Sequence, residues 1–299
     1  KNITKINDLE ENMFTRKYEL THITEKPWIF GTLKTDKIIQ KIEKIDTTLG
    51  SISSEIFQGL ATTADPVYIM NYVSETKNEI ILYSKTLQQN IQLEKNAVKP
   101  ILKGAQIRRY YLEKPTKYFI FPYTLNKGRA ILIETKEFRK KFPKTLNYLQ
   151  KNREILDKRE IDKKTKIGKL AKSPEWYGYS QEHNLNKFEF KKILTQVLSY
   201  HAQFAIDESG LNYFVGGGTA GGNGIILKES YVNEDKEIHY YICGLLNSCL
   251  EEFYLRSKNS TFRGGYIPYG RKYTEILPIP LSTNQHKKLL RKEITKNVK

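Results

Sequence analysis

Features that mark several common protein classes are missing from this 299-residue sequence. No apolar run approaches the roughly 20 residues that a membrane-spanning helix needs, so no membrane partner is expected. The first residues, 1–4, contain neither an initiator methionine nor the apolar stretch of a signal peptide. We therefore expect either an excised piece of a longer polypeptide or a chain from which a short leader has been removed.

Cysteine and histidine are scarce, which argues against a metal centre. Cys243 and Cys249 are the two cysteines, and their spacing matches neither a disulfide framework nor a zinc site, so a reducing cytoplasm is the expected location. The five histidines include no pair at a metal-ligand spacing such as i, i+4. No serine–histidine–aspartate or cysteine–histidine arrangement can be argued either. We therefore expect neither a metal site nor a catalytic residue in this chain.

The glycine-rich stretch 216–221, Gly-Gly-Gly-Thr-Ala-Gly, matches the G-x-G-x-x-G spacing of dinucleotide-binding loops. Such a loop must open a helix, whereas residues 225–227, Ile-Ile-Leu, predict a strand. The Gly-Lys-Ser/Thr of a P-loop is also absent. A flexible hairpin tip, or a loop whose backbone amides approach phosphate, is therefore favoured. No cofactor is expected in this chain.

Asp65 belongs to the outlines of two catalytic sites. Residues 65–68, Asp-Pro-Val-Tyr, differ at one position from the D-P-P-Y signature of amino-methyltransferases, in which the tyrosine stacks on a flipped base. No strand followed by a glycine-rich cofactor turn precedes them. Asp65 with Glu75 and Lys77 also outlines a magnesium-dependent nuclease, but loose patterns of this kind arise by chance in a highly charged chain. Both outlines are interpreted as accidental, and the nuclease is kept as a weaker alternative.

Positive charge and tyrosine are what the sequence has in abundance. Lys and Arg total 50 against 33 acidic residues, a formal charge of +17, and a globular protein this basic usually binds a polyanion. The alternative is that a composition rich in Lys, Ile, Asn and Tyr reflects an AT-rich genome. The 20 tyrosines and 13 phenylalanines, many of them beside basic residues, favour nucleic acid, because aromatic rings stack on bases.

The pattern of apolar residues predicts a mixed α+β fold with two lobes. Residues 1–27 are interpreted as a linker or the end of a preceding domain, residues 28–285 as the main domain and residues 286–299 as a basic helix. Apolar residues at helical spacing over 135–160 predict a long charged helix that joins the lobes, with either a kink or a restart at Pro143.

Each lobe is expected to combine strands with helix. In the first lobe, an amphipathic helix over 35–45 precedes a β-hairpin formed by residues 67–70 and 80–83, and a basic, strand-rich segment covers 98–133. In the second lobe, the predicted elements are strands near 193–199, 203–206 and 211–215, a helix from about 236 to 256 and a strand over 276–280.

Residues that would contact nucleic acid fall into two groups. Residues 260–273 place three cations and three tyrosines in a loop rich in glycine and proline, and arginine can bond bidentately to guanine O6 and N7. A packed tyrosine among ordinary surface cations is the alternative interpretation of this loop. Base readout is assigned to Arg263, Tyr266, Tyr269 and Arg271, with Lys272 as a further DNA contact and Gln58 and Thr62 as weaker candidates. Phosphate contacts are expected from Lys103, Arg108, Arg109, Lys117 and Lys127.

An ordered series of short motifs resembles one known family, the TaqI-like C-terminal specificity domains of type IIG restriction enzymes and related N6-adenine DNA methyltransferases. The opening motif, residues 56–65, resembles the G-x-x-T-x-x-D turn of that family. The ending at residues 278–280, followed by Gln285, is also similar to the P-x-P…Q ending of type I specificity subunits. The other landmarks are residues 99–104, 117–123, 142–149, 176–179, 204–208, 241–248 and 276–280.

The resemblance implies a function, partners and cofactors. In that family a methyltransferase domain lies N-terminal and carries the cofactor loop and an N-P-P-Y motif, and this sequence has neither. The chain is therefore expected to recognise a specific sequence in double-stranded DNA and to position an adenine for N6 methylation by a covalently linked or separate methyltransferase domain. S-adenosylmethionine, and Mg²⁺ if a nuclease is present, are implied for the missing domains. A specificity subunit that acts as a binding module in a larger complex is the alternative.

Overall fold

The computed structural model describes residues 33–126, 128–165, 167–259, 261–281 and 285–299. The chain divides between Lys41 and Ile42 into two compact units. The first unit includes most of helix α1 (Leu33–Ile42), which confirms the amphipathic helix expected at 35–45. The predicted linker over 1–27 lies outside the described residues.

The second unit contains a six-stranded sheet and a four-stranded sheet. The six strands are β2 (Ile69–Glu75), β3 (Glu79–Ser84), β4 (Gln89–Glu94), β5 (Val98–Leu102), β8 (Lys117–Ile120) and β14 (Tyr213–Phe214). Their order is β14-β5-β8-β2-β3-β4; β14 runs parallel to β5, and the other neighbours are antiparallel. The β2–β3 pair confirms the hairpin predicted from residues 67–70 and 80–83.

The four-stranded sheet is antiparallel throughout. Its strands, in spatial order, are β1 (Ser53–Gln58), β15 (Gly222–Leu227), β11 (Lys192–Gln196) and β13 (Phe204–Asp207). The described chain also contains the two-stranded ribbons β6 (Ile107–Arg108) with β7 (Tyr111–Leu112), β9 (Tyr123–Asn126) with β10 (Arg129–Leu132), and β12 (Leu198–Ser199) with β16 (Ile267–Pro268). Because helices accompany both sheets, the predicted α+β class is confirmed.

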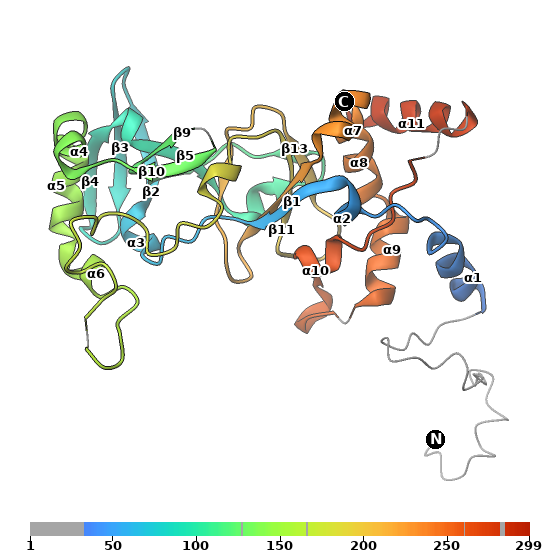
Figure 1. Cartoon of the computed structure of the whole chain (residues 1–299), viewed down its shortest axis with the longest axis horizontal. Helices are drawn as coiled ribbons and strands as arrows, with labels where there is room; N and C mark the ends of the chain where they lie inside the picture. The colour runs from blue at the N-terminus through green and yellow to red at the C-terminus, as the bar shows by residue number, and fades with distance from the viewer. Residues whose placement is uncertain (1–32, 127, 166, 260, 282–284) are drawn as a thin grey trace, which may run out of the picture. The chain divides into compact units, whose positions relative to one another are not determined.

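The helical pattern predicted over 135–160 restarts at Pro143, one of the two alternatives expected there, but the prediction of a single helix that joins the lobes is wrong. Three shorter helices replace it: α4 (Thr135–Lys141), α5 (Pro143–Lys151) and α6 (Arg153–Asp157). They border the six-stranded sheet and do not link the lobes, as Figure 1 shows in green. Phe142 leaves the helical conformation, as expected for a residue that precedes proline. The Glu94 carboxylate on β4 accepts the backbone N–H groups of Lys144 and Thr145, which fixes the start of α5 against the sheet.

Helices beside the four-stranded sheet also differ from the prediction at one point. They are α7 (Glu229–Glu234), α8 (Ile238–Leu246) and α9 (Cys249–Lys258). The helix predicted over 236–256 is interrupted, because Ser248 leaves the helical conformation and caps α9 by accepting the N–H of Glu251. The helix α11 (Gln285–Val298) confirms the predicted basic helix.

Three short helices adjoin strands of the sheets and ribbons. The helix α2 (Leu49–Ile52) leads into β1, α3 (Asp65–Tyr68) leads into β2, and α10 (Arg271–Thr274) follows β16. The strand predicted over 276–280 is wrong: an isolated bridge joins Thr48 to Pro278, and proline cannot donate to a longer ladder.

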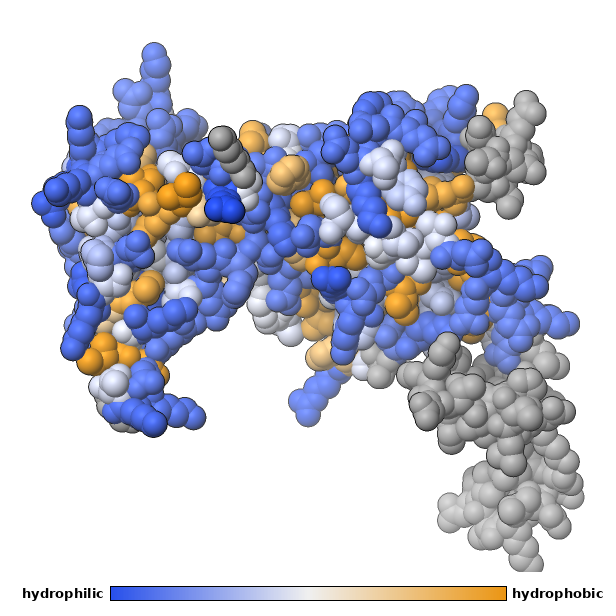
Figure 2. All heavy atoms as spheres, in the orientation of Figure 1, coloured by the Kyte–Doolittle hydropathy of each residue, from blue (hydrophilic) through white to orange (hydrophobic). Residues whose placement is uncertain are grey.

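On the face drawn in Figure 2, hydrophilic residues cover most of the surface and hydrophobic ones form separate patches. No helix among the described residues is long and apolar enough to cross a membrane.

Two of the segments that join the sheets, one from β1 to β2 and one from β14 to β15, contact each other. They run side by side: the N–H of Leu60 donates to Phe214 O at 2.8 Å, and the N–H of Gly216 donates to Leu60 O at 2.7 Å. A side chain at Gly59 would collide with the backbone of Phe214 and Val215, and one at Gly216 would collide with Gly59 O. Glycine is therefore required where the segments lie against each other.

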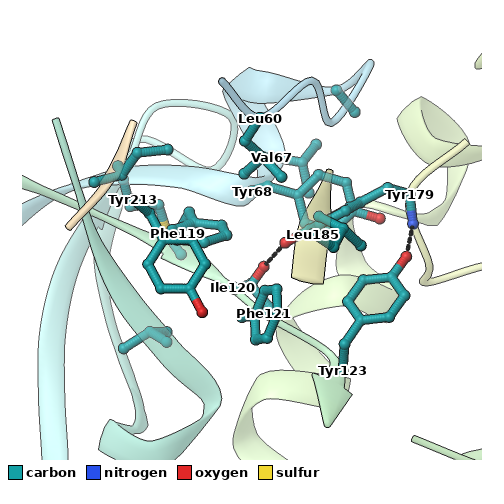
Figure 3. Close-up of a cluster of buried hydrophobic side chains, with 14 of the residues drawn as sticks. Leu60, Val67, Tyr68, Phe119, Ile120, Phe121, Tyr123, Tyr179, Leu185 and Tyr213 are labelled. Atoms are coloured by element: carbon teal, nitrogen blue, oxygen red, sulfur yellow. Dashed lines mark hydrogen bonds between the residues drawn. The ribbon is translucent and has the colours of Figure 1, made fainter. Parts of the chain in front are cut away.

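Aromatic side chains fill a buried cluster beside the six-stranded sheet (Figure 3). The ring of Tyr179 meets Tyr68 edge-on at 5.0 Å and lies 5.0 Å from Tyr123. Its hydroxyl donates to Ile120 O, and its backbone N–H donates to Tyr123 Oη at 2.6 Å. Burial raises the pKa of Tyr179 well above its usual value. Two motifs on which the family resemblance rests therefore meet inside the fold.

Candidate nucleic-acid interface

Three lysines of the six-stranded sheet lie close enough for their charges to interact, and they are called the lysine cluster below. Lys117 begins β8 and pairs with Ile101 near the end of β5; Lys103 follows β5 closely, and Lys85 follows β3. Partial burial lowers the pKa of Lys117, and so do the charges of Lys103 and Lys85. The groups that shift this pKa include no carboxylate. The cluster therefore carries concentrated positive charge suited to a phosphate.

The lysine cluster continues into the β6–β7 hairpin. Gln106 is buried at the foot of the hairpin, where its Oε1 accepts the N–H of Lys103 at 3.0 Å and its Nε2 donates to Lys114 O at 3.0 Å. Arg108 is exposed and pairs with Glu113 across the hairpin at 2.7 Å. An exposed pair of this kind contributes little to stability, so Arg108 can exchange its carboxylate for a phosphate at small cost.

The tip of the hairpin is a two-residue turn, Arg109-Tyr110, with both side chains exposed. The N–H of Arg109 donates to Gln203 Oε1 at 2.7 Å, and the N–H of Tyr110 donates to Phe204 O at 2.8 Å. The Arg109 guanidinium lies over the Tyr110 ring, 5.3 Å from its centre. Tyr111, the next residue, is also exposed. The tip is thus tied to the connection between β12 and β13.

The connection between β12 and β13 in turn contacts the loop before β16. Tyr200 packs edge-on against Tyr266, with ring centres 5.2 Å apart. Arg256 on α9 donates to Tyr200 O at 2.6 Å and to Gly265 O at 3.5 Å, which holds the two segments together. Arg263 and Tyr266, two of the residues assigned to base readout, are exposed in this loop.

These contacts connect residues of distant segments into one surface, which we call the basic–aromatic strip. It extends from the lysine cluster, over the β6–β7 hairpin, to the loop before β16. Arginine, lysine and tyrosine are the side chains that nucleic-acid surfaces use for phosphates and for base faces. The strip consists of Lys85, Lys103, Arg108, Arg109, Tyr110, Tyr111, Lys117, Tyr200, Arg263 and Tyr266.

The strip contains six of the residues assigned to DNA from the sequence, and two others are buried instead. Thr62 Oγ1 donates to Asp65 Oδ1 at 2.5 Å in the turn before α3, and Tyr269 packs edge-on against Phe204 at 5.5 Å. Direct base contact by Thr62 and Tyr269 is therefore wrong, because both side chains face into the fold. Lys127 lies outside the described residues. The six on the strip are Lys103, Arg108, Arg109, Lys117, Arg263 and Tyr266.

Gln58, Arg271 and Lys272 are exposed but lie apart from the strip. Arg271 pairs with Glu275 at 3.1 Å, and both line a pocket of about 260 Å³ beside β1. Gln58 ends the same strand. Because β1 is one edge of the four-stranded sheet and the hairpin packs on β13 at the other edge, these residues form a second group of candidates.

The two catalytic outlines at Asp65 do not form sites. Tyr68 is buried, and its hydroxyl is enclosed by backbone carbonyls and the Arg159 guanidinium, so its ring cannot stack on a flipped base. Asp65 precedes the seven-residue strand β2 and Glu75 ends it, which separates the carboxylates by roughly 20 Å. Glu75 instead pairs with Lys95 at 3.0 Å. Across the described ranges, no three His, Cys, Asp or Glu residues are grouped to hold a metal ion.

The glycine-rich turn 216–221 joins β14 to β15, so a strand follows it where a dinucleotide loop requires a helix. The turn therefore does not fit a nucleotide cofactor. Gly217 and Gly218 have positive φ values of 75° and 58°, with open space around them. The N–H of Gly104 donates to Ala220 O at 2.9 Å, which places the turn beside the lysine cluster.

Four strip residues were not identified from the sequence. Lys85 lies in a separate turn, and the strand register that brings it near Lys117 is a tertiary property. Tyr110 and Tyr111 carried a usable signal, because they follow two arginines in a basic–aromatic run of the kind that identified the C-terminal loop. Tyr200 had no local signal and is assigned by its contact with Tyr266.

Comparison with known proteins agrees with this arrangement. Residues 99–279 match the family model of the TaqI-like C-terminal specificity domain, a range that includes every strip residue except Lys85. Over 280 residues the chain is 24% identical to the type II restriction enzyme and methyltransferase RM.Eco57I of Escherichia coli. The aligned region covers 91% of this chain and 27% of that protein. The chain thus spans about a quarter of the length of this curated relative. Because the family match extends over more than half of its residues, the chain belongs to the family of TaqI-like C-terminal specificity domains.

Proposed function

We propose that the basic–aromatic strip binds duplex DNA, with the lysine cluster on phosphates and the hairpin and C-terminal loop directed toward bases. Family membership makes the chain a DNA-recognition domain of a restriction–modification enzyme. The strip supplies a specific means: cations hold the backbone of the duplex in register, and arginine and tyrosine side chains then meet base edges and faces at fixed positions.

The lysine cluster is the observation that carries this proposal. Lys117 pairs across the sheet with Ile101, two residues before Lys103. Burial lowers the pKa of Lys117, and the charges of Lys103 and Lys85 lower it further, so like charges repel at this place. A phosphate placed among them would remove the repulsion and release the counterions condensed on DNA. The fold itself gains no stability from gathering these charges, so a polyanionic ligand accounts for them best.

We further propose that the domain holds the duplex so that an adenine is positioned for N6 methylation by a methyltransferase domain outside these 299 residues. The relative from Escherichia coli is named as a restriction enzyme and a methyltransferase, and this chain matches 27% of it, which supports a covalently linked domain. S-adenosylmethionine would be bound there, because the glycine-rich turn of this chain is followed by a strand and does not fit a nucleotide cofactor. Mg²⁺, if the parent protein also cleaves DNA, would likewise be bound outside this chain.

The proposal is tested by the salt dependence of DNA binding, measured by fluorescence anisotropy with a labelled 30-base-pair duplex. Contacts with about 6–10 phosphates should weaken binding by about 10³–10⁵-fold between 50 and 200 mM salt. The double variant Lys103→Gln/Lys117→Gln should reduce the slope of log K against log salt by about two, since each lost phosphate contact removes about one unit.

A matched control removes the same charge elsewhere. Lys136 and Lys140 are exposed on α4, outside the strip, and Lys136→Gln/Lys140→Gln should leave the slope unchanged. A flat salt response of the unaltered chain would contradict binding to phosphates altogether. Equal slopes for the two double variants would show that the phosphates lie elsewhere on the surface.

A further inference from the structure

Tyr110 occupies a backbone conformation that tyrosine rarely adopts. It is the second residue of the turn between β6 and β7, and its φ is +72°. In this left-handed region the side chain crowds its own backbone, so glycine or asparagine is the usual occupant. Glycine at this position would relieve the strain, which means that the tyrosine ring is retained at a cost in stability.

Hydrogen bonds on both sides hold the strained turn in place. Arg109 and Tyr110 donate their backbone N–H groups to Gln203 Oε1 and Phe204 O, at 2.7 and 2.8 Å. At the foot of the hairpin, the N–H of Glu113 donates to the carbonyl of residue 106 at 2.9 Å. The turn cannot relax to a commoner conformation without losing these bonds, so it forms a rigid projection from the edge of the four-stranded sheet.

This projection presents aromatic surface beside positive charge. Tyr110 is 41% exposed and Tyr111 is 58% exposed. The Arg109 guanidinium lies on one side of the Tyr110 ring, and Lys103 of the lysine cluster stands at the foot of the same hairpin. The exposed part of each residue leaves apolar surface uncovered by the chain, so the gain from burying that part is available to a bound partner.

We propose that Tyr110 is a wedge that stacks against one base step of the bound duplex and bends it. The inference rests on the proposed function, since it requires a duplex on the basic–aromatic strip. With phosphates held by the lysine cluster, the tip enters the adjacent groove, the ring of Tyr110 meets base faces, and Arg109 neutralises a phosphate beside the opened step. Because the tip is already rigid, little conformational entropy is lost on binding.

A wedge of this kind contributes to sequence preference without a hydrogen bond to any base. Pyrimidine–purine steps unstack and kink more readily than other steps, so the cost of inserting a ring depends on the sequence at that position. Tyr110 would therefore favour duplexes that place such a step under the hairpin, in addition to any base readout by Arg263 and Tyr266.

The test compares a 30-base-pair duplex with the same duplex carrying a central two-nucleotide bulge, each labelled with donor and acceptor dyes at its ends. The bulge is already bent and unstacked, so the 299-residue chain should bind it about tenfold more tightly, the range expected for one base–aromatic stack. On the intact duplex the chain should raise the energy transfer between the dyes, because bending brings the ends together.

Variants separate stacking from folding. Tyr110→Gly should abolish both the preference for the bulge and the rise in energy transfer while raising Tm, because the turn relaxes and the fold is kept. Tyr110→Phe should retain both effects, since the ring remains. Phe190, 51% exposed beside the opposite end of β13, provides the control Phe190→Ala, which should bend DNA like the unaltered chain.

The outcomes distinguish this inference from the function on which it rests. If Tyr110→Gly bends the duplex and prefers the bulge as the unaltered chain does, the wedge is overturned while salt-dependent binding of duplex DNA stands. If Tyr110→Gly lowers Tm, the assignment of strain at the turn is overturned. If the unaltered chain binds neither duplex at low salt, the wedge and the proposed function both fail.

Discussion

Lys192 Nζ lies 2.6 Å from Asp207 Oδ2, and neither side chain is exposed to solvent. The pair joins β11 to β13, the strand on which the β6–β7 hairpin packs. The ammonium is also enclosed by the backbone carbonyls of Phe188, Phe190 and Gly210. Burial lowers the pKa of Lys192, and the charge of Asp207 opposes this shift. The pair therefore depends on both partners being present.

Asp207→Asn should lower the free energy of unfolding by about 3–5 kcal/mol, because it leaves the Lys192 charge buried without a counter-charge. Urea denaturation followed by circular dichroism measures this loss. The neighbouring pair Lys191–Glu208, 2.6 Å apart but partly exposed, provides the control: Glu208→Gln should cost about 1 kcal/mol or less. The double variant Lys192→Met/Asp207→Asn should recover part of the loss. A double variant as unstable as Asp207→Asn would contradict the buried-charge explanation.

Gly59→Ala should destabilise the chain by about 1–3 kcal/mol or more, because the added methyl group collides with backbone atoms of the segment that runs alongside. Thermal unfolding measures the change. Gly270→Ala is the matched control, since its φ of −65° suits alanine and a methyl group added there would meet its nearest neighbour, the Tyr273 ring, at 3.8 Å. It should change the free energy of unfolding by less than about 1 kcal/mol. Equal effects of the two substitutions would contradict a specific backbone contact at Gly59.

Stability should fall with acidity because of His239. Burial and the nearby Lys191 lower the pKa of His239 to about 4, with Glu208 opposing the shift. Between pH 6.5 and 4 the unfolded chain binds a proton at this residue and the folded chain does not, so its contribution, present above pH 6.5, is lost as the pH falls. The slope from this residue is about 1.4 kcal/mol per pH unit. His239→Gln should flatten the pH dependence of urea unfolding; an unchanged slope would show that His239 is protonated in the folded chain.

Arg263 and Arg271 should differ in their effect on DNA binding, although each carries one charge. Arg263 lies on the basic–aromatic strip, so Arg263→Ala should weaken binding and, if it contacts a phosphate, reduce the salt slope by about one. Arg271 is paired with Glu275 beside the other edge of the sheet, and Arg271→Ala should leave the slope unchanged. A loss of preference at one base pair in Arg271→Ala, by about 1–3 kcal/mol, would instead restore its assignment to base readout.

Local patterns identified much of the fold. The β2–β3 hairpin and three strands of the four-stranded sheet, β11, β13 and β15, follow from short runs of β-branched and aromatic residues between turn signals, whereas β1 was not predicted. The breaks in the predicted helix over 135–160 depend partly on Glu94, a residue of a distant strand that binds the first N–H groups of α5. A contact of this kind has no trace in the helical periodicity, so one long helix was the natural prediction.

Residues of the candidate site could be predicted from the sequence where their neighbours in the chain are basic or aromatic. They could not be predicted where tertiary packing decides whether a side chain is exposed. Lys103, Lys117 and the arginines of the hairpin were identified by their basic, strand-rich surroundings. The loop 260–273 contains a buried tyrosine, Tyr269, which packs against Phe204, and an exposed one, Tyr266. The sequence of the loop does not distinguish the two. Lys85 joins the cluster through strand register, which side-chain chemistry does not encode.

The pairing of the two connecting segments has a consequence for how such a domain can change its target. Its hydrogen bonds join backbone atoms of Leu60, Phe214 and Gly216, so the spacing between the lysine cluster and the loop before β16 does not depend on surface side chains. Substitutions on the strip can therefore alter which bases are favoured without altering where along the duplex they are met. A specificity domain could acquire a new target in this way while the spacing of its contacts along the duplex stays constant.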